Sequence, residues 1–333
     1  MKLTIKQWVQ VILSLSFAVF IFWYLYKDIS GATLWNSIQE TNMAWLAGSI
    51  GVALAGYYLR AWRWKLLLQA DGNQQVTTFR VLLALMIGYL ANMVVPRAGE
   101  VARCGVLAQT DHITIGKSIG TVILERTIDL LFFLGLIFLG FAAESRLFLS
   151  LVAELVSVDT LKEKLTSMLP LLLAGLAVAI LFAYIVFNKY RDKGIFKKVR
   201  HFIRDVFAGL VSLKKVQNQT GFWASSFLIW ITYYLTMVMV AWAIPSTASL
   251  SLTSVLMVMV MGSIGMIAPV QGGIGTFHAL VAFILMVFGL SEEEGKIFAA
   301  IIHGSQVLTI IVVGLVSLGL YFKIISGKAS KMA

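Results

Sequence analysis

The chain has 333 residues, of which 59% are hydrophobic and 13% charged, and its mean hydropathy is +0.87. Apolar runs of roughly 20 residues recur along it, which is typical of a polytopic membrane protein and leaves no segment polar enough for a separate soluble domain. The distribution of its net charge of +11 favours a membrane surface over nucleic acid as partner, and its single cysteine, Cys104, excludes an internal disulfide.

Eight apolar segments follow one another along the chain. Six are long enough to span a membrane, namely 8–26, 43–62, 118–142, 169–187, 222–243 and 297–322. The first ends in bulky aromatic residues rather than a cleavage site, which indicates a retained anchor. The other two, 79–104 and 252–289, are broken at Pro96 and Pro269. The sequence therefore predicts an all-α polytopic membrane protein with six full spans and two broken or re-entrant helical segments.

The basic residues set the predicted topology. The loop between Asn188 and Thr220 carries nine Lys and Arg residues, and such loops lie in the cytoplasm. This loop lies in the cytoplasm if 79–104 enters and leaves the membrane on the cytoplasmic side. Segment 252–289 must then begin and end outside, as a re-entrant hairpin or a pair of short helices. Both termini are then cytoplasmic.

This topology gives the two halves opposite orientations, which predicts an inverted repeat of the kind found in transporters. The predicted parts are a first membrane repeat (1–143), an extracytoplasmic loop (144–168), a second membrane repeat (169–325) and a cytoplasmic tail (326–333). Within the second repeat, apolar residues recur at helical spacing in 195–213 beside lysines and arginines. This pattern indicates an amphipathic helix at the membrane surface, drawn to anionic headgroups or serving only as a topological signal.

The first break gathers polar residues at membrane depth. Arg97 and Glu100 are three residues apart, as are Glu100 and Arg103, so on a helix that starts after Pro96 they would be neighbours. An arginine fork suits a phosphate, and the helix N-terminus adds amide donors. Asn92 and the helix-breaking Gly99 complete this segment. We predict a lipid-headgroup site here, with an internal ion-pair cluster as the alternative.

The predicted span 118–142 carries Glu125, Arg126 and Asp129 within an apolar helix. At about 1.5 Å per residue, Asp129 lies about 18 Å deep, near the midplane of the bilayer. Ionisable groups at that depth are costly, and they are paired or functional. The triplet therefore predicts either a headgroup relay or proton-coupled carboxylate, or a structural network with Arg97 or Arg103.

The second break is rich in glycine. Gln271, Gly272, Gly273 and Gly275 lie at a turn that leads into a helix, where their amides could form a nest for an anion. They are added to the predicted headgroup site.

Four further residues carry weaker signals. His278 and His303 fit hydrogen-bonded interior histidines better than proton carriers. Arg60 and Arg63 end the second predicted span beside tryptophans, which is typical of an interface anchor.

Signatures of enzymes are lacking in the sequence. It has no phosphate-binding loop, dinucleotide fingerprint, nucleophile elbow or cluster of metal ligands. We therefore expect no enzyme, no cofactor and no metal. Movement of a cargo would be passive, ion-coupled or driven by a partner.

Three motifs occur in a fixed order: N-x-x-x-P-R-x-G-E-x-x-R from Asn92 to Arg103, E-R-x-x-D from Glu125, and P-x-x-G-G-x-G from Pro269. With them the chain resembles the flippase-like transmembrane family, which includes the membrane half of lysylphosphatidylglycerol synthase, the multiple peptide resistance factor. The resemblance implies translocation of an anionic, aminoacylated or polyprenyl-phosphate-linked lipid in a bacterial-type plasma membrane. Because the chain ends at Ala333, we expect no aminoacyltransferase domain and no lysyl transfer.

The sequence leaves three functions open. The first is a lipid flippase or scramblase. The second is a non-transporting membrane partner that presents lipid to a separate glycosyl- or aminoacyltransferase, and the third is an ion-coupled solute carrier that uses Glu125 and Asp129. A homo-oligomer is compatible with all three.

Overall fold

The computed structural model describes residues 16, 19–70, 75–95, 98–147, 213–268 and 270–332. The chain divides into two compact units, 1–140 with 213–333, and 141–212. Of the second unit only 141–147 are described. The predicted span 169–187 and, apart from Leu213, the predicted basic helix lie outside the described residues, as do Pro96, Arg97 and Pro269.

All regular structure in the described residues is helical, which confirms the predicted all-α class. The helices are α2 (Gly31–Glu40), α3 (Met43–Leu68), α4 (Thr78–Val94), α5 (Ala98–Asp111), α6 (Ile115–Ala143), α10 (Gln219–Ala243), α11 (Leu252–Gly265), α12 (Thr276–Val287) and α13 (Glu292–Met332). Three short 3-10 turns connect them, η1 (Leu213–Lys215), η2 (Pro245–Thr247) and η3 (Gln271–Gly273). Four predicted spans fall within α3, α6, α10 and α13, whereas the short helix α2 was not predicted.

Length and composition identify two of the described helices as membrane spans, Gln219–Ala243 and Glu292–Gly327. Shorter apolar helices form at the two breaks, α4 before the first, and α11 and α12 around the second. Of the predicted full spans, α10 and α13 therefore meet this criterion, and the predicted broken segments form shorter helices.

Polar side chains fix where several helices begin. The Asn42 carboxamide accepts hydrogen bonds from the backbone of Ala44 and Trp45, at 3.0 and 3.4 Å. Ser251 likewise caps α11 by accepting from the Ser254 amide at 3.0 Å. Such caps satisfy amides that the first helical turn leaves without partners, which matters most where water is scarce.

Each broken segment folds back on itself as a helical hairpin. In the first, α4 packs against α5 where Gly88 meets Gly99, and the backbone oxygen of each glycine occupies the space that a side chain on the other would need. In the second, α11 packs against α12, and a Cβ on Gly265 would lie 2.7 Å from the Cα of Phe277. Close contact through small residues is how helices associate where hydrophobic burial gives little drive.

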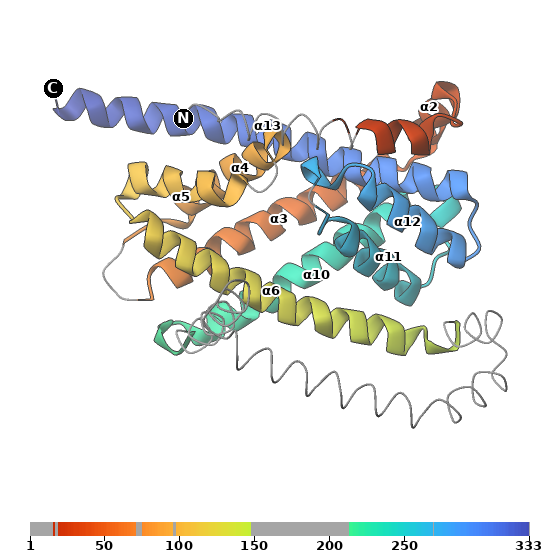
Figure 1. The fold of residues 1–333 in the computed structure, drawn as a ribbon, viewed down its shortest axis with the longest axis horizontal. Coiled ribbons are helices and arrows are strands. Elements are labelled where there is room, and N and C mark those ends of the chain that lie inside the picture. The colour runs from red at the N-terminus through yellow and green to blue at the C-terminus, as the bar shows by residue number, and fades with distance from the viewer. Residues whose placement is uncertain are drawn as a thin grey trace, which may run out of the picture. The chain divides into compact units, whose positions relative to one another are not determined.

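Helices far apart in the sequence pack together within the first unit. The most extensive packing joins α3 to α10, and α13 runs along α4 and α12 (Figure 1). The turn η3 contacts α4, so the tip of the second hairpin lies on the first.

Candidate functional site

The most distinctive feature of the first unit is a buried cluster of charged side chains. Glu125 on α6 is fully buried and binds three arginines. Its Oε1 lies 3.1 Å from Arg60 Nη2 and 3.3 Å from Arg63 Nη2, both on α3. Its Oε2 lies 3.0 Å from Nη2 of Arg103, on α5. Asp129 adds a second carboxylate, with Oδ1 2.7 Å from Arg63 Nη2. We call these five residues the charge cluster.

Helical spacing explains why these side chains converge. Arg60 and Arg63 are three residues apart on α3, and Glu125 and Asp129 are four apart on α6, so each pair occupies one face of its helix. Arg103 approaches from the first hairpin. Three separate helices are therefore joined through one carboxylate.

The charge cluster is not balanced. Its three guanidinium groups and two carboxylates leave one excess positive charge. In addition, no described group accepts a hydrogen bond from the buried Nε atoms of Arg60, Arg63 and Arg103. Buried donors are rarely left without partners, and buried excess charge is costly. The cluster thus has both the charge and the donors to bind an anion.

Aromatic side chains surround the cluster. Arg60 donates to the Tyr233 hydroxyl at 2.8 Å and lies over the Tyr89 ring, 5.7 Å from its centre. Arg103 lies 4.3 Å from the centre of the Trp64 ring. These contacts stabilise the guanidinium groups without neutralising them. The Tyr89 hydroxyl is a further buried group that has no hydrogen-bond partner in the part of the chain that the structure describes.

The structure changes the interpretation of the second predicted span. As an interface anchor, Arg60 and Arg63 would extend to the headgroups, yet they are buried and bound to Glu125 and Asp129. The sequence signal was available, because both arginines lie within α3 at a spacing that places them on one face. The neighbouring Tyr89, Tyr233 and Trp64 were not identified as site residues.

Arg126 and Glu100 form a separate pair. Arg126 Nε donates to Glu100 Oε1 at 2.8 Å, and the two side chains are 48% and 41% exposed. The predicted triplet Glu125, Arg126 and Asp129 therefore does not act as one group. Successive helical residues point in different directions, so Arg126 leaves the face shared by the two acids.

The first break is held together by its own polar group. The Asn92 carboxamide accepts a hydrogen bond from the Gly99 amide at 2.6 Å. Asn92 thus ties α4 to the start of α5 through its side-chain oxygen. Of the predicted residues in this segment, Arg103 alone reaches the charge cluster among those that the structure describes.

The second break differs from the predicted anion nest. Gly272, Gly273 and Gly275 have φ values of 58°, 74° and 88°, a conformation that favours glycine. However, the Gly273 amide donates to the Val270 carbonyl at 3.4 Å, and the Gly275 amide donates to His278 Nδ1 at 3.2 Å. Two of the three amides therefore already have partners inside the protein.

His278 and His303 are interior residues, in agreement with the reading favoured from the sequence. Both are buried, and His278 Nε2 lies 3.3 Å from His303 Nδ1. Because the Gly275 amide donates to His278 Nδ1, the proton of a neutral His278 lies on Nε2, directed at His303. His303 in turn hydrogen-bonds the backbone of Gly272. The pair therefore joins α12 and α13 to the glycine turn.

No metal site is found in the described part of the chain, where no group of three His, Cys, Asp or Glu residues has the arrangement to hold an ion.

Comparison with protein families gives one clear result. The family model of the lysylphosphatidylglycerol synthase TM region matches residues 11–314. The match confirms the resemblance drawn from the three motifs and covers the membrane half of that family. Comparisons with curated proteins and with solved structures give no match. The chain is a membrane protein, and it belongs to the family of the lysylphosphatidylglycerol synthase transmembrane region.

Proposed function

We propose that this protein moves an anionic or phosphate-bearing lipid across the membrane. The observation that carries the proposal is the charge cluster, with one excess positive charge and three buried arginine Nε donors that have no partner among the described residues. A lipid phosphate supplies one negative charge and several acceptor oxygens, so it complements both. The membership of a lipid-related membrane family supports the same class of cargo.

The arrangement of the helices supports a transport pathway. In our proposal the hairpins α4–α5 and α11–α12 enter from opposite faces of the membrane, as halves of an inverted repeat, and rocking of the halves alternates access to the cluster. The packing of α3 on α10 supports this, because these are the corresponding second spans of the two halves. The contact of η3 with α4 supports it as well.

Cysteine labelling tests the proposed topology. In a Cys104→Ser background, Thr114→Cys lies in a predicted cytoplasmic loop and Glu293→Cys in a predicted outer loop, and both positions are exposed. We expect an impermeant maleimide to label Glu293→Cys in intact cells and Thr114→Cys only in inside-out vesicles. Labelling of both from the same side would contradict the opposite orientation of the halves.

Lipid transport is tested in reconstituted vesicles. The probe is fluorescent phosphatidylglycerol in phosphatidylcholine vesicles, and movement is followed with an impermeant quencher. We expect Arg103→Gln to slow the movement tenfold or more, because it removes the excess charge and one buried donor. Glu125 keeps Arg60 and Arg63, so the variant should remain folded.

The matched control is Lys323→Gln, which removes one positive charge at an exposed position of α13 and should leave transport unchanged. Equal transport by the wild type and Arg103→Gln would refute a role of the cluster. Lipid that co-purifies with the wild type but does not move would overturn transport in favour of a protein that presents lipid to an enzyme.

A further inference from the structure

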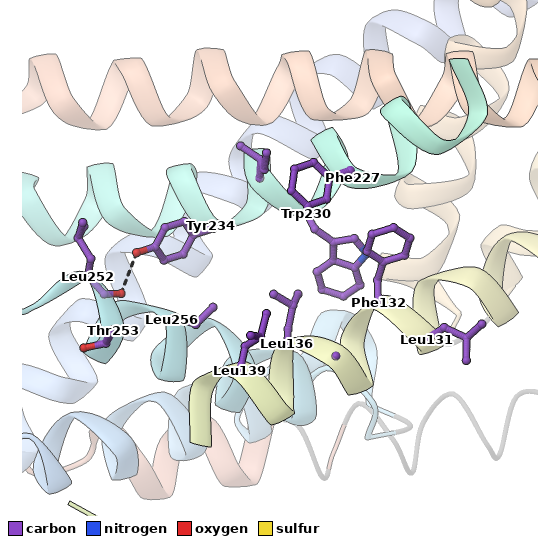
Figure 2. Close-up of a pocket in the computed structure, with 12 residues that line it drawn as sticks. Leu131, Phe132, Leu136, Leu139, Phe227, Trp230, Tyr234, Leu252, Thr253 and Leu256 are labelled. Atoms are coloured by element: carbon purple, nitrogen blue, oxygen red, sulfur yellow. Dashed lines mark hydrogen bonds between the residues drawn. The ribbon is translucent and has the colours of Figure 1, made fainter. Parts of the chain in front are cut away.

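An apolar cavity of about 620 Å³ lies between α6, α10 and α11 (Figure 2). Leu131, Leu136 and Leu139 of α6 form one wall, and Phe227 and Trp230 of α10 face them. The cavity therefore presents hydrocarbon and aromatic surface from all three helices.

Hydroxyl groups in the cavity wall already have partners. The Tyr234 hydroxyl donates to the Leu252 carbonyl at 2.8 Å, as the dashed line in Figure 2 shows. The Thr253 hydroxyl lies 2.9 Å from that of Ser251. A ligand in this cavity would thus gain burial of apolar surface rather than hydrogen bonds to these hydroxyls.

One end of the cavity adjoins the charge cluster. Phe132, which also lines the cavity, follows Asp129 by three residues on α6 and therefore shares its side of the helix. On α10, the Trp230 ring contacts the Tyr233 ring, with centres 5.6 Å apart, and the Tyr233 hydroxyl accepts from Arg60. From Leu131 to Leu139 the cavity wall then extends about 12 Å along α6, away from the acids. The charged donors therefore lie at one end of the apolar cavity, just as the polar headgroup of an amphiphile lies at one end of its apolar chain.

The surroundings of α6 supply such a ligand. Leu130, Leu134 and Phe138 are 52%, 52% and 73% exposed, on sides of α6 that do not line the cavity. In a membrane protein, exposed apolar helix surface of this kind contacts lipid chains. A hydrocarbon chain is thus the ligand present at the highest local concentration.

We propose that this cavity binds one hydrocarbon chain of the lipid whose phosphate occupies the charge cluster. This proposal rests on the proposed function and adds to it the binding site of the lipid's hydrocarbon tail. The cavity volume is that of a drug-sized ligand, which corresponds to one chain rather than a whole lipid. The remaining part of the lipid stays in the bilayer.

Two tryptophan substitutions on α6 test the proposal. Leu136→Trp fills the cavity, whereas Leu134→Trp adds the same indole at an exposed position that does not line it. In the phosphatidylglycerol assay we expect Leu136→Trp to slow transport tenfold or more and to co-purify with less lipid. Leu134→Trp should match the wild type in both.

The outcomes separate this proposal from the proposed function. If the wild type does not move the probe, the proposed function fails. If Arg103→Gln blocks movement and Leu136→Trp does not, the function stands and the cavity is not the chain site. If Leu136→Trp lowers the melting temperature of lipid-free protein to the same degree as that of lipid-loaded protein, another segment of the chain occupies the cavity, which also overturns the proposal.

Discussion

Replacing Glu125 by Gln is expected to lower the free energy of unfolding by about 3–5 kcal/mol, the usual effect of removing one partner from a buried ion cluster. Glu125 is fully buried and holds Arg60, Arg63 and Arg103. Without its charge, Arg60 and Arg63 still pair with Asp129, whereas Arg103 loses its ion pair with Glu125. The expected result is a large fall in the melting temperature of the detergent-purified protein and in the folded yield.

Glu100→Gln is the matched control, because Glu100 binds one arginine at a half-exposed site whereas Glu125 binds three at a fully buried one, so its loss should lower the melting temperature less. The prediction would be wrong if the two variants had similar melting temperatures. A double variant, Glu125→Gln with Arg103→Gln, should recover part of the loss, since it removes one of the uncompensated cations.

Gly99→Ala is expected to destabilise the first hairpin by about 1–3 kcal/mol, the cost of adding an atom to a closely packed contact. The added Cβ would meet the backbone oxygen of Gly88 and the side chain of Asn92. A backbone oxygen cannot rotate away, so α4 and α5 must separate, and the Asn92 hydrogen bond to the Gly99 amide weakens. Because Arg103 lies on the same helix, transport should fall with stability.

Gly105→Ala on the same helix provides the comparison. A Cβ there meets nothing within 4 Å, so the variant should be neutral or more stable by about 0.5–1 kcal/mol. Thermal unfolding of the two variants side by side measures the difference. Equal stability would show that α4 and α5 do not pack as closely as described.

The sequence predicts the helices and the two breaks well, because long apolar runs and prolines are strong local signals. It also identifies Arg103 and Glu125 as partners in one of two alternatives. It does not predict that Arg60 and Arg63 join them. That contact connects residues more than sixty positions apart and depends on how α3 packs, which apolar residues on all sides of a membrane helix do not specify.

The glycine turn shows another limit. Its positive φ values follow from the residue type, but they are compatible both with a nest of free amides and with a closed turn. His278, three residues beyond Gly275, engages one of these amides by accepting a hydrogen bond from it. The separation of Arg126 from Glu125, in contrast, follows from helix geometry and can be predicted from the sequence.

The single excess positive charge of the cluster makes the protein sensitive to the membrane potential. With a lipid that carries one negative charge, the occupied cluster is electrically neutral, whereas the empty cluster carries one positive charge. Moving one elementary charge across the whole membrane at a potential of 100 mV changes its free energy by about 2.3 kcal/mol. In the transport cycle that we propose, the membrane potential, negative inside, therefore acts on the empty protein rather than on the loaded one, and it draws the empty site toward the cytoplasm.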